Sequence, residues 1–390
     1  MIAAMPPMGW NSWNTFYDNI SEELVFAMAD AMAESGLAEA GYKYLIIDDC
    51  WSEKERDNGG NLVPDRKKFP GGMKKVADYV HSKGLKFGMY SCCGVRTCAD
   101  YPGSFEHEYA DARQFASWGV DYLKYDNGYR PSSLATPLLY RRMAMALRDT
   151  GRDVLFAACQ WGSDDVTGWI RSSGAHTFRS TIDIQDNWDS ISSIAKSQLD
   201  AQCFNAPGCF NDMDMLVVGM YGKGQNPETS GGKAGCSDTE YETHMALWAM
   251  MNSPLIIGCD IRSMNDHTAS LLMNKDLISI NQDIEARGCY HLPVYANNDA
   301  FILVRPLSDG DYAIGFFNYG EKDADITLDL WDIGLTITSG TKNMVYDCFS
   351  HDIIGEVIDR IACKTLAHGC RVFKLTRCSL HKDHDERRAS

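Results

Sequence analysis

Aspartate side chains recur in the first two-thirds of the chain, each time close behind a short apolar run. Tryptophans, one arginine and one lysine also lie at or just after the ends of such apolar runs. Carboxylates and an ammonium group exchange hydrogen bonds with hydroxyls, and an indole face covers the apolar side of a pyranose ring. Two facing carboxylates could act as nucleophile and general acid/base at a glycosidic bond. The residues in question are Trp13, Asp48, Asp49, Lys124, Asp126, Arg179, Asp183, Asp212, Asp214 and Asp260.

A single aspartate at such a place carries little weight, because aspartate and asparagine often cap helices for structural reasons. Aspartates after five apolar runs, together with Lys124, favour a functional ring of acidic groups. Lys124 and Asp126 are two residues apart, so on a strand they share one face. A neighbouring ammonium lowers the pKa of a carboxyl group, and we therefore expect Asp126 to stay ionised.

The apolar runs alternate with amphipathic stretches, which is typical of parallel strands joined by helices. Eight such repeats in about 290 residues predict an α/β fold, a (β/α)8 TIM barrel, with its active site at the carboxyl ends of the strands. A doubly wound sheet is the alternative, but the glycine-rich turn expected after its first strand is absent. Strands are expected near residues 8–13, 44–49, 86–91, 121–126, 154–159, 176–179, 210–215 and 254–259, and helices near 21–35, 71–83, 107–118, 135–149, 165–172, 189–202, 239–252 and 267–275.

Short alternating runs without a helical period follow residue 281, with turn residues between them. This pattern predicts a C-terminal antiparallel β-sandwich. The predicted domains are therefore a catalytic barrel over residues 1–290 and a β-sandwich over residues 291–390. The strands expected in the second domain are 300–305, 312–318, 324–329 and 371–375.

The chain has 390 residues, of which 53 are acidic and 37 basic, and its net charge is −16. Nucleic acids and anionic membranes favour basic patches, so neither is expected as a partner. No apolar run approaches the ~20 residues of a membrane span. The expected partner is a small-molecule carbohydrate. Residues 219–237 are predicted to form a long loop that shapes the aglycone side, makes a homo-oligomer contact or is a plain surface insertion.

Fourteen cysteines are present, many inside apolar segments. A chain of this length does not need disulfides, so we expect mostly reduced, buried thiols and hence a cytoplasmic location. A chain from which a signal peptide has been removed would look the same. Neither a CxxC nor an HExxH motif occurs, and no metal or cofactor is expected.

Five ordered motifs of the chain closely resemble those of glycoside hydrolase family 27, the retaining α-galactosidases and α-N-acetylgalactosaminidases. The resemblance covers nearly the whole chain. It implies a retaining exo-glycosidase that hydrolyses terminal α-linked galactose by double displacement through a covalent glycosyl-enzyme intermediate. The retaining outcome requires the two carboxyl groups to lie about 5–5.5 Å apart. The motifs are MGWNSW at 8–13, YLIIDDCW at 44–51, GVDYLKYDN at 119–127, RSTIDI at 179–184 and NDMDML at 211–216.

The resemblance also implies roles for single residues. The family's nucleophile maps onto Asp126 and its acid/base onto Asp183. Asp48 and Asp49 correspond to the pair that holds hydroxyls of the terminal sugar, and the presence of both favours a sugar with a 6-hydroxyl over an arabinopyranoside. Arg179 would orient the sugar 2-hydroxyl or Asp183, with a plain salt bridge as the alternative. The remaining sugar contacts map onto Trp13, Tyr90, Lys124 and Asp214.

The sequence departs from the family pattern at several places. Gln160 replaces the glutamate that α-galactosidases commonly have near the 2-substituent, where N-acetylgalactosaminidases use a small residue, so its bulk favours galactose. The family usually has a cysteine two residues after the nucleophile, bonded to one in the loop after the third strand. Here that position is Gly128, while Cys98 matches the second cysteine. Cys50 and Cys159 also lack their usual partners, Asp18 and Ala175 lie near those places, and a pairing through Cys92 or Cys93 stays open.

Three other functions stay open on the sequence alone. An α-N-acetylgalactosaminidase would share the family motifs. A catalytically silent carbohydrate-binding protein on this scaffold would lack a carboxylate, but both Asp126 and Asp183 are present. A divalent-metal hydrolase would place paired histidines at strand ends, and only His176 is near one.

Overall fold

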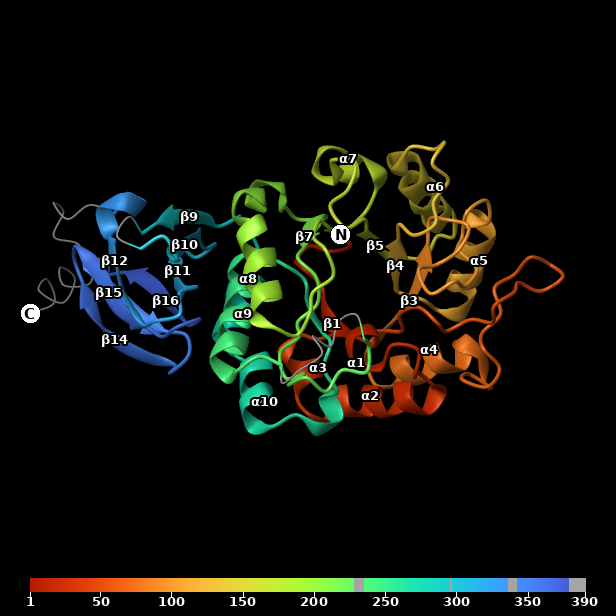
Figure 1. Ribbon diagram of the computed structural model, residues 1–390, viewed down its shortest axis with the longest axis horizontal. Coiled ribbons are helices and arrows are strands. Elements are labelled where there is room, and N and C mark those ends of the chain that lie inside the picture. Colours follow the sequence, from red (N-terminus) through yellow and green to blue (C-terminus); the bar gives the residue numbers. More distant parts are fainter. Residues whose placement is uncertain (228–234, 295–296, 336–341, 379–390) are drawn as a thin grey trace, which may run out of the picture.

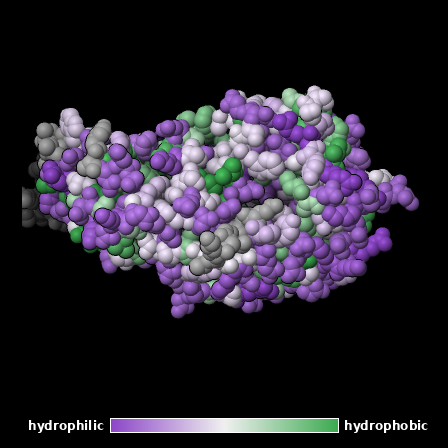
Figure 2. Space-filling view, in the orientation of Figure 1, coloured by the Kyte–Doolittle hydropathy of each residue, from purple (hydrophilic) through white to green (hydrophobic). Residues whose placement is uncertain are grey.

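The computed structural model describes residues 1–227, 235–294, 297–335 and 342–378, and shows a helix-covered barrel with a β-rich region at one end (Figure 1). The face seen in Figure 2 is mostly hydrophilic. No helix in the described ranges is long and apolar enough to cross a membrane.

Parallel strands form an eight-stranded sheet in the order β7-β6-β5-β4-β3-β2-β1-β8. Leu216, shortly beyond β7, pairs with Ile257 of β8 in parallel, and its N–H donates to the carbonyl oxygen of Ile256 at 2.8 Å. The sheet therefore closes on itself, and the predicted (β/α)8 barrel is confirmed. The strands are β1 (Met8–Asn11), β2 (Tyr44–Ile46), β3 (Lys86–Cys92), β4 (Tyr122–Asp126), β5 (Leu155–Cys159), β6 (Thr177–Arg179), β7 (Phe210–Asp212) and β8 (Leu255–Ile257).

Helices follow the strands at all the expected places. Ser21 caps the first long one, because its hydroxyl accepts the N–H of Leu24 at 3.2 Å, and Ser237 and Glu240 form a capping box at the start of α9. The helices of the described residues are α1 (Trp13–Phe16), α2 (Glu22–Glu34), α3 (Leu37–Ala40), α4 (Gly72–Ser82), α5 (Glu108–Trp118), α6 (Thr136–Asp149), α7 (Val166–Ser173), α8 (Trp188–Ser197), α9 (Asp238–Met250), α10 (Asp266–Leu272) and α11 (Lys275–Asn281).

The described part of the C-terminal region is antiparallel. A six-stranded sheet has the order β14-β13-β16-β11-β10-β9, and β12 pairs with β15 in a second sheet. Apolar side chains from both sheets, among them Ile302, Phe316, Ile326 and Leu328, form one core, as a β-sandwich requires. The strands are β9 (Tyr290–Pro293), β10 (Ala300–Pro306), β11 (Tyr312–Asn318), β12 (Ala324–Asp329), β13 (Asn343–Asp347), β14 (Asp352–Val357), β15 (Arg360–Thr365) and β16 (Cys370–Arg377).

Helix α9 lies between the barrel and the C-terminal sheets (Figure 1). Thr243 on this helix donates to the carbonyl oxygen of His368 at 2.7 Å, and Arg305 of β10 donates to the carbonyl oxygen of Ala249 at 3.2 Å. The helix is buried on almost every side. The predicted domain limit at residue 290 coincides with the start of β9, and it stays a prediction.

All fourteen cysteines lie in the described residues, and none of them is paired there. Gly128 does face Cys98, because a Cβ atom placed on Gly128 would lie 2.7 Å from the Cys98 sulfur. Most of the other thiols are buried. Part of the predicted 219–237 loop, residues 228–234, lies outside the described residues.

Candidate active site

One pocket collects the polar side chains at the carboxyl ends of the barrel strands, where enzymes of this fold place their chemistry. All the predicted catalytic and sugar-contact residues except Asp49 and Gln160 line it, whereas the further strand-end aspartates Asp212 and Asp260 do not. The lining residues are Trp13, Asn14, Asp48, Tyr90, Cys98, Lys124, Asp126, Cys159, Trp161, Arg179, Asp183, Asp214 and Met215.

Asp126 ends β4 and is 6% exposed. The hydroxyl of Tyr90 donates to its Oδ2 at 2.7 Å and the N–H of Asn127 donates to its Oδ1 at 2.8 Å, so both oxygens are oriented. Burial raises the pKa of Asp126, although Lys124, Tyr90 and Asn127 act in the opposite direction. Lys124 does lower the pKa of Asp126, as expected, but the removal of the carboxylate from water outweighs it, so the net shift is upward.

Lys124 is instead paired with Asp48. Its Nζ atom lies 2.8 Å from Asp48 Oδ2, and Asn11 donates to the same oxygen at 2.7 Å. Burial opposes the ammonium charge, but the carboxylate of Asp48 outweighs this and raises the pKa of Lys124. The ammonium group of Lys124 and the carboxylate of Asp48 therefore lie side by side in one wall of the pocket, as a hydrogen-bond donor and an acceptor.

Arg179 at the end of β6 joins two carboxylates. It forms an ion pair with Asp183 and donates to Asp214 Oδ1 at 2.9 Å. The other oxygen of Asp214 accepts the N–H of Ile184 at 2.7 Å. The Asp183 side chain is 49% exposed, whereas that of Arg179 is 4% exposed. Burial opposes ionisation of Asp183, but the guanidinium of Arg179 outweighs it and lowers the pKa of Asp183.

Asp49 lies behind the pocket wall. Its carboxylate accepts the N–H groups of Cys50 at 2.7 Å and of Ala99 at 3.1 Å, and burial raises its pKa to about 6. These bonds fix the segment that carries Cys98 to the end of β2. The predicted contact of Asp49 with a sugar hydroxyl stays a prediction.

Gln160 is fully buried and does not line the pocket. Its two neighbours, Cys159 and Trp161, do line it. Gln160 and Trp161 follow the end of β5, and Trp161 has a positive φ, so the strand alternation does not continue through them. Both polar atoms of the Gln160 side chain are buried without a hydrogen-bond partner among the described residues. The sequence places Trp161 at the end of this strand without assigning it to the sugar, and Cys159, the last residue of β5, was missed. Asn14, Cys98 and Met215 were missed as well.

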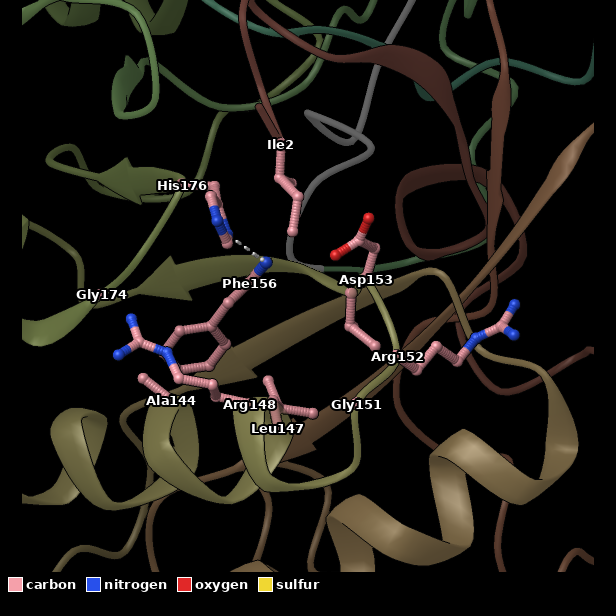
Figure 3. A pocket seen from close by; sticks show the side chains of 11 residues that line it. Ile2, Ala144, Leu147, Arg148, Gly151, Arg152, Asp153, Phe156, Gly174 and His176 are labelled. Carbon is pink, nitrogen blue, oxygen red and sulfur yellow. Dashed lines mark hydrogen bonds between the residues drawn. The ribbon is translucent and has the colours of Figure 1, made fainter.

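A second cavity, of about 260 Å³, opens at the other end of the barrel, by the amino ends of β5 and β6 (Figure 3). His176 lines it, and its Nδ1 accepts the N–H of Phe156 at 2.9 Å. Burial lowers the pKa of His176, which is therefore neutral. This histidine lies at the end of the barrel opposite the acidic pocket, and the described residues contain no group of three His, Cys, Asp or Glu side chains that could hold a metal.

A closed (β/α)8 barrel with four aspartates, two tryptophans and a lysine in one pocket indicates a glycoside hydrolase. The family model for "Alpha galactosidase A" matches residues 5–283, and that for the "Alpha galactosidase C-terminal beta sandwich domain" matches residues 297–375. The chain belongs to glycoside hydrolase family 27, as its motifs predicted.

The chain is similar to α-galactosidases over nearly its whole length. It is 42% identical to the α-galactosidase of Cyamopsis tetragonoloba, over 96% of this chain and 87% of that protein. α-Galactosidase I from Mortierella vinacea has 32% identity and a TM-score of 0.88, over 96% and 97% of the two chains. The α-galactosidase from Saccharomyces cerevisiae with raffinose has 29% identity and a TM-score of 0.85, over 97% and 98%. The predicted activity, that of a glycosidase releasing α-linked galactose, is confirmed.

The prediction of a cytoplasmic location is wrong. Homologous α-galactosidases are mostly secreted or lysosomal enzymes. The prediction rested on cysteines without partners, and most of these are buried. A buried thiol packs as a small apolar side chain in any compartment, so its burial does not report on the surroundings of the protein.

Proposed function

We propose that the enzyme hydrolyses terminal α-galactosides with retention, with Asp126 as nucleophile and Asp183 as acid/base. The observation that carries this assignment is the contrast between the two carboxyl groups in one pocket. Asp126 is buried and oriented through both oxygens, as an attacking group should be. Asp183 is half-exposed, so its carboxyl can reach both a leaving oxygen and water.

The reaction then has two steps. The carboxylate of Asp126 bonds to the anomeric carbon, the bond to the aglycone oxygen breaks, and Asp183 gives its proton to that oxygen. In the second step Asp183 takes a proton from water, the water oxygen bonds to the anomeric carbon, and the ester bond to Asp126 breaks. The configuration inverts twice and is retained.

The protonation of Asp183 requires a change at Arg179. Their ion pair lowers the pKa of Asp183, whereas the first step needs that carboxyl group protonated. We infer that a sugar hydroxyl competes for the guanidinium and weakens the pair, so that Asp183 takes up a proton as substrate binds. Asp214 keeps Arg179 in place meanwhile, through the bond of 2.9 Å.

The remaining pocket residues are assigned to the sugar. The Lys124–Asp48 pair offers a donor and an acceptor to neighbouring hydroxyls, and Trp13 offers an indole face. Cys159 and Trp161, rather than Gln160, would form the wall next to the 2-position. The bulk of an indole there favours galactose over N-acetylgalactosamine. A homo-oligomer contact through the 219–237 loop stays a prediction.

Two variants test the assignment with α-galactosides of different leaving groups. Asp126→Asn should abolish turnover of every substrate. Asp183→Asn should lower kcat/KM for methyl α-galactoside by about 10²–10⁴-fold, because its leaving group needs a proton, and much less for the dinitrophenyl galactoside. Proton NMR of the first-formed galactose should show the α-anomer. Release of the β-anomer, or full activity of Asp126→Asn, would overturn the assignment.

A further inference from the structure

The segment that carries Asp183 belongs to no strand or helix. It runs from the end of β6 at Arg179 to the start of α8 at Trp188, and its side chains alternate in burial. Ile184 and Asp186 are 0% and 1% exposed, while the Asp183 side chain is 49% exposed. A loop that presents a catalytic group to solvent needs fixed points on either side of it, because 1 Å of misplacement can cost about 10²-fold in rate.

Asp186 is one such fixed point. Its Oδ1 accepts the hydroxyl of Tyr241 on α9 at 2.7 Å, and its Oδ2 accepts the N–H of Gly222 in the loop after β7 at 2.7 Å. Cys236, at the far end of that loop, also donates to it. The hydroxyl of Tyr241 in turn accepts the N–H of Tyr221 at 2.7 Å. One buried carboxylate thus ties together three separate segments through neutral donors.

The other fixed point is Asp214, which accepts the N–H of Ile184 at 2.7 Å. The indole of Trp248 donates to the backbone oxygen of Asp214 at 2.7 Å. Tyr241 and Trp248 are seven residues apart on α9, which is two helical turns, so they lie on the same face of that helix. Asp183 is therefore held between two anchors that α9 supports in common.

We propose that Asp186 is a positioning residue that holds the Asp183 carboxyl group in place for proton transfer, with Tyr241 as its support. The proposal rests on the acid/base role of Asp183. A buried carboxylate without a cation is costly in free energy, and several hydrogen bonds are needed to keep it there. Asp186 has these bonds, and each connects the acid/base loop to a segment that faces the same end of the barrel.

The test separates positioning from stability by the leaving group of the substrate. Tyr241→Phe removes one donor to Asp186 and keeps the ring. Tyr42→Phe is the matched control, because Tyr42 is equally buried and donates to the Leu272 carbonyl oxygen at 2.8 Å away from the site. We expect Tyr241→Phe to lower kcat/KM for methyl α-galactoside about 10-fold and that for the dinitrophenyl galactoside less than about 2-fold. Asp186→Asn should give the same pattern more strongly.

An equal loss on both substrates, or the same pattern in Tyr42→Phe, would overturn the proposal. Thermal unfolding of each variant, followed without substrate, shows how much of a loss is due to stability alone. A failure of the proposed function would look different. If Asp183 is not the acid/base, the loss of kcat/KM in Asp183→Asn should not depend on the leaving group of the substrate. If Asp183→Asn shows this dependence and Tyr241→Phe does not, only the role of Asp186 is refuted.

Discussion

Replacement of Gly128 by cysteine should create the disulfide that the chain lacks. A Cβ atom at this position would lie 2.7 Å from the sulfur of Cys98, close to the separation that two bonded cysteines need. Gly128 does not have a positive φ, so a side chain is tolerated there. Without a covalent bond, however, a separation of 2.7 Å between the new Cβ atom and the Cys98 sulfur is shorter than a van der Waals contact. Gly128→Cys should therefore be less stable than the parent when reduced and more stable when oxidised.

The size of the gain follows from the loop that the bond closes. Residues 98 and 128 enclose about 30 residues, for which loss of chain entropy in the unfolded state gives about 3.5 kcal/mol at 25 °C. The unfolding temperature should rise by several degrees on oxidation. Gly128→Ser is the matched control, with a similar side chain and no bond.

The assay is thermal unfolding with and without dithiothreitol, together with thiol titration of the denatured protein. Oxidised Gly128→Cys should lose two thiols relative to its reduced form, and Gly128→Cys/Cys98→Ser should lose none. If oxidised Gly128→Cys has lost two thiols but unfolds at no higher temperature than its reduced form, the argument from chain entropy of the unfolded state is refuted. If Gly128→Cys forms no disulfide on oxidation, the conclusion that positions 98 and 128 face each other is refuted.

Three further predictions concern the pocket. The reactive form has Asp126 ionised and Asp183 protonated, and it is a minor species of the free enzyme because the pKa of Asp126 is raised and that of Asp183 is lowered. kcat/KM should therefore rise with pH through the lower pKa, that of Asp183, and fall through the higher one, that of Asp126; an optimum above neutral pH would contradict this. Tyr90→Phe removes a bond that lowers the pKa of Asp126, so the falling limb of the kcat/KM profile should move to higher pH while the rising limb stays in place. Trp161→Ala should raise the ratio of N-acetylgalactosaminidase to galactosidase activity on paired aryl glycosides, whereas Gln160→Ala should not, and the reverse result would restore Gln160 to the sugar site.

The barrel could be predicted from the sequence because its signals are local. Each signal spans only a few residues of sequence. These signals are the spacing of apolar residues, helix caps such as Ser21, and the change from helical to alternating patterns after residue 281. In the C-terminal region, β14 was missed because its residues are almost all exposed and show no alternation. The strands β9, β13 and β15 were also not predicted.

The site was predicted less completely, for physical reasons. The motifs indicate the residue types, but the direction of a side chain just beyond β5 depends on the local backbone, which at Trp161 has a positive φ, and so Gln160 was placed where Cys159 and Trp161 lie. The pKa of Asp126 depends on how much protein surrounds it, which no spacing in the sequence reports. Lys124 was expected to serve Asp126, yet its nearest anion comes from a strand end 76 residues earlier in the chain.

The electrostatic arrangement of the pocket suits Asp183 to both of its proposed roles. The charge of Asp183 raises the pKa of Asp126, and since the interaction between two charges is mutual, ionised Asp126 also raises the pKa of Asp183. This effect favours protonation of Asp183 before the first step, although in the free enzyme the ion pair with Arg179 outweighs it and lowers the pKa of Asp183. When Asp126 becomes an ester it loses its charge, so this effect ends, while Arg179 remains and lowers the pKa of Asp183. The same carboxyl group is then an anion in the second step, when it must accept a proton from water.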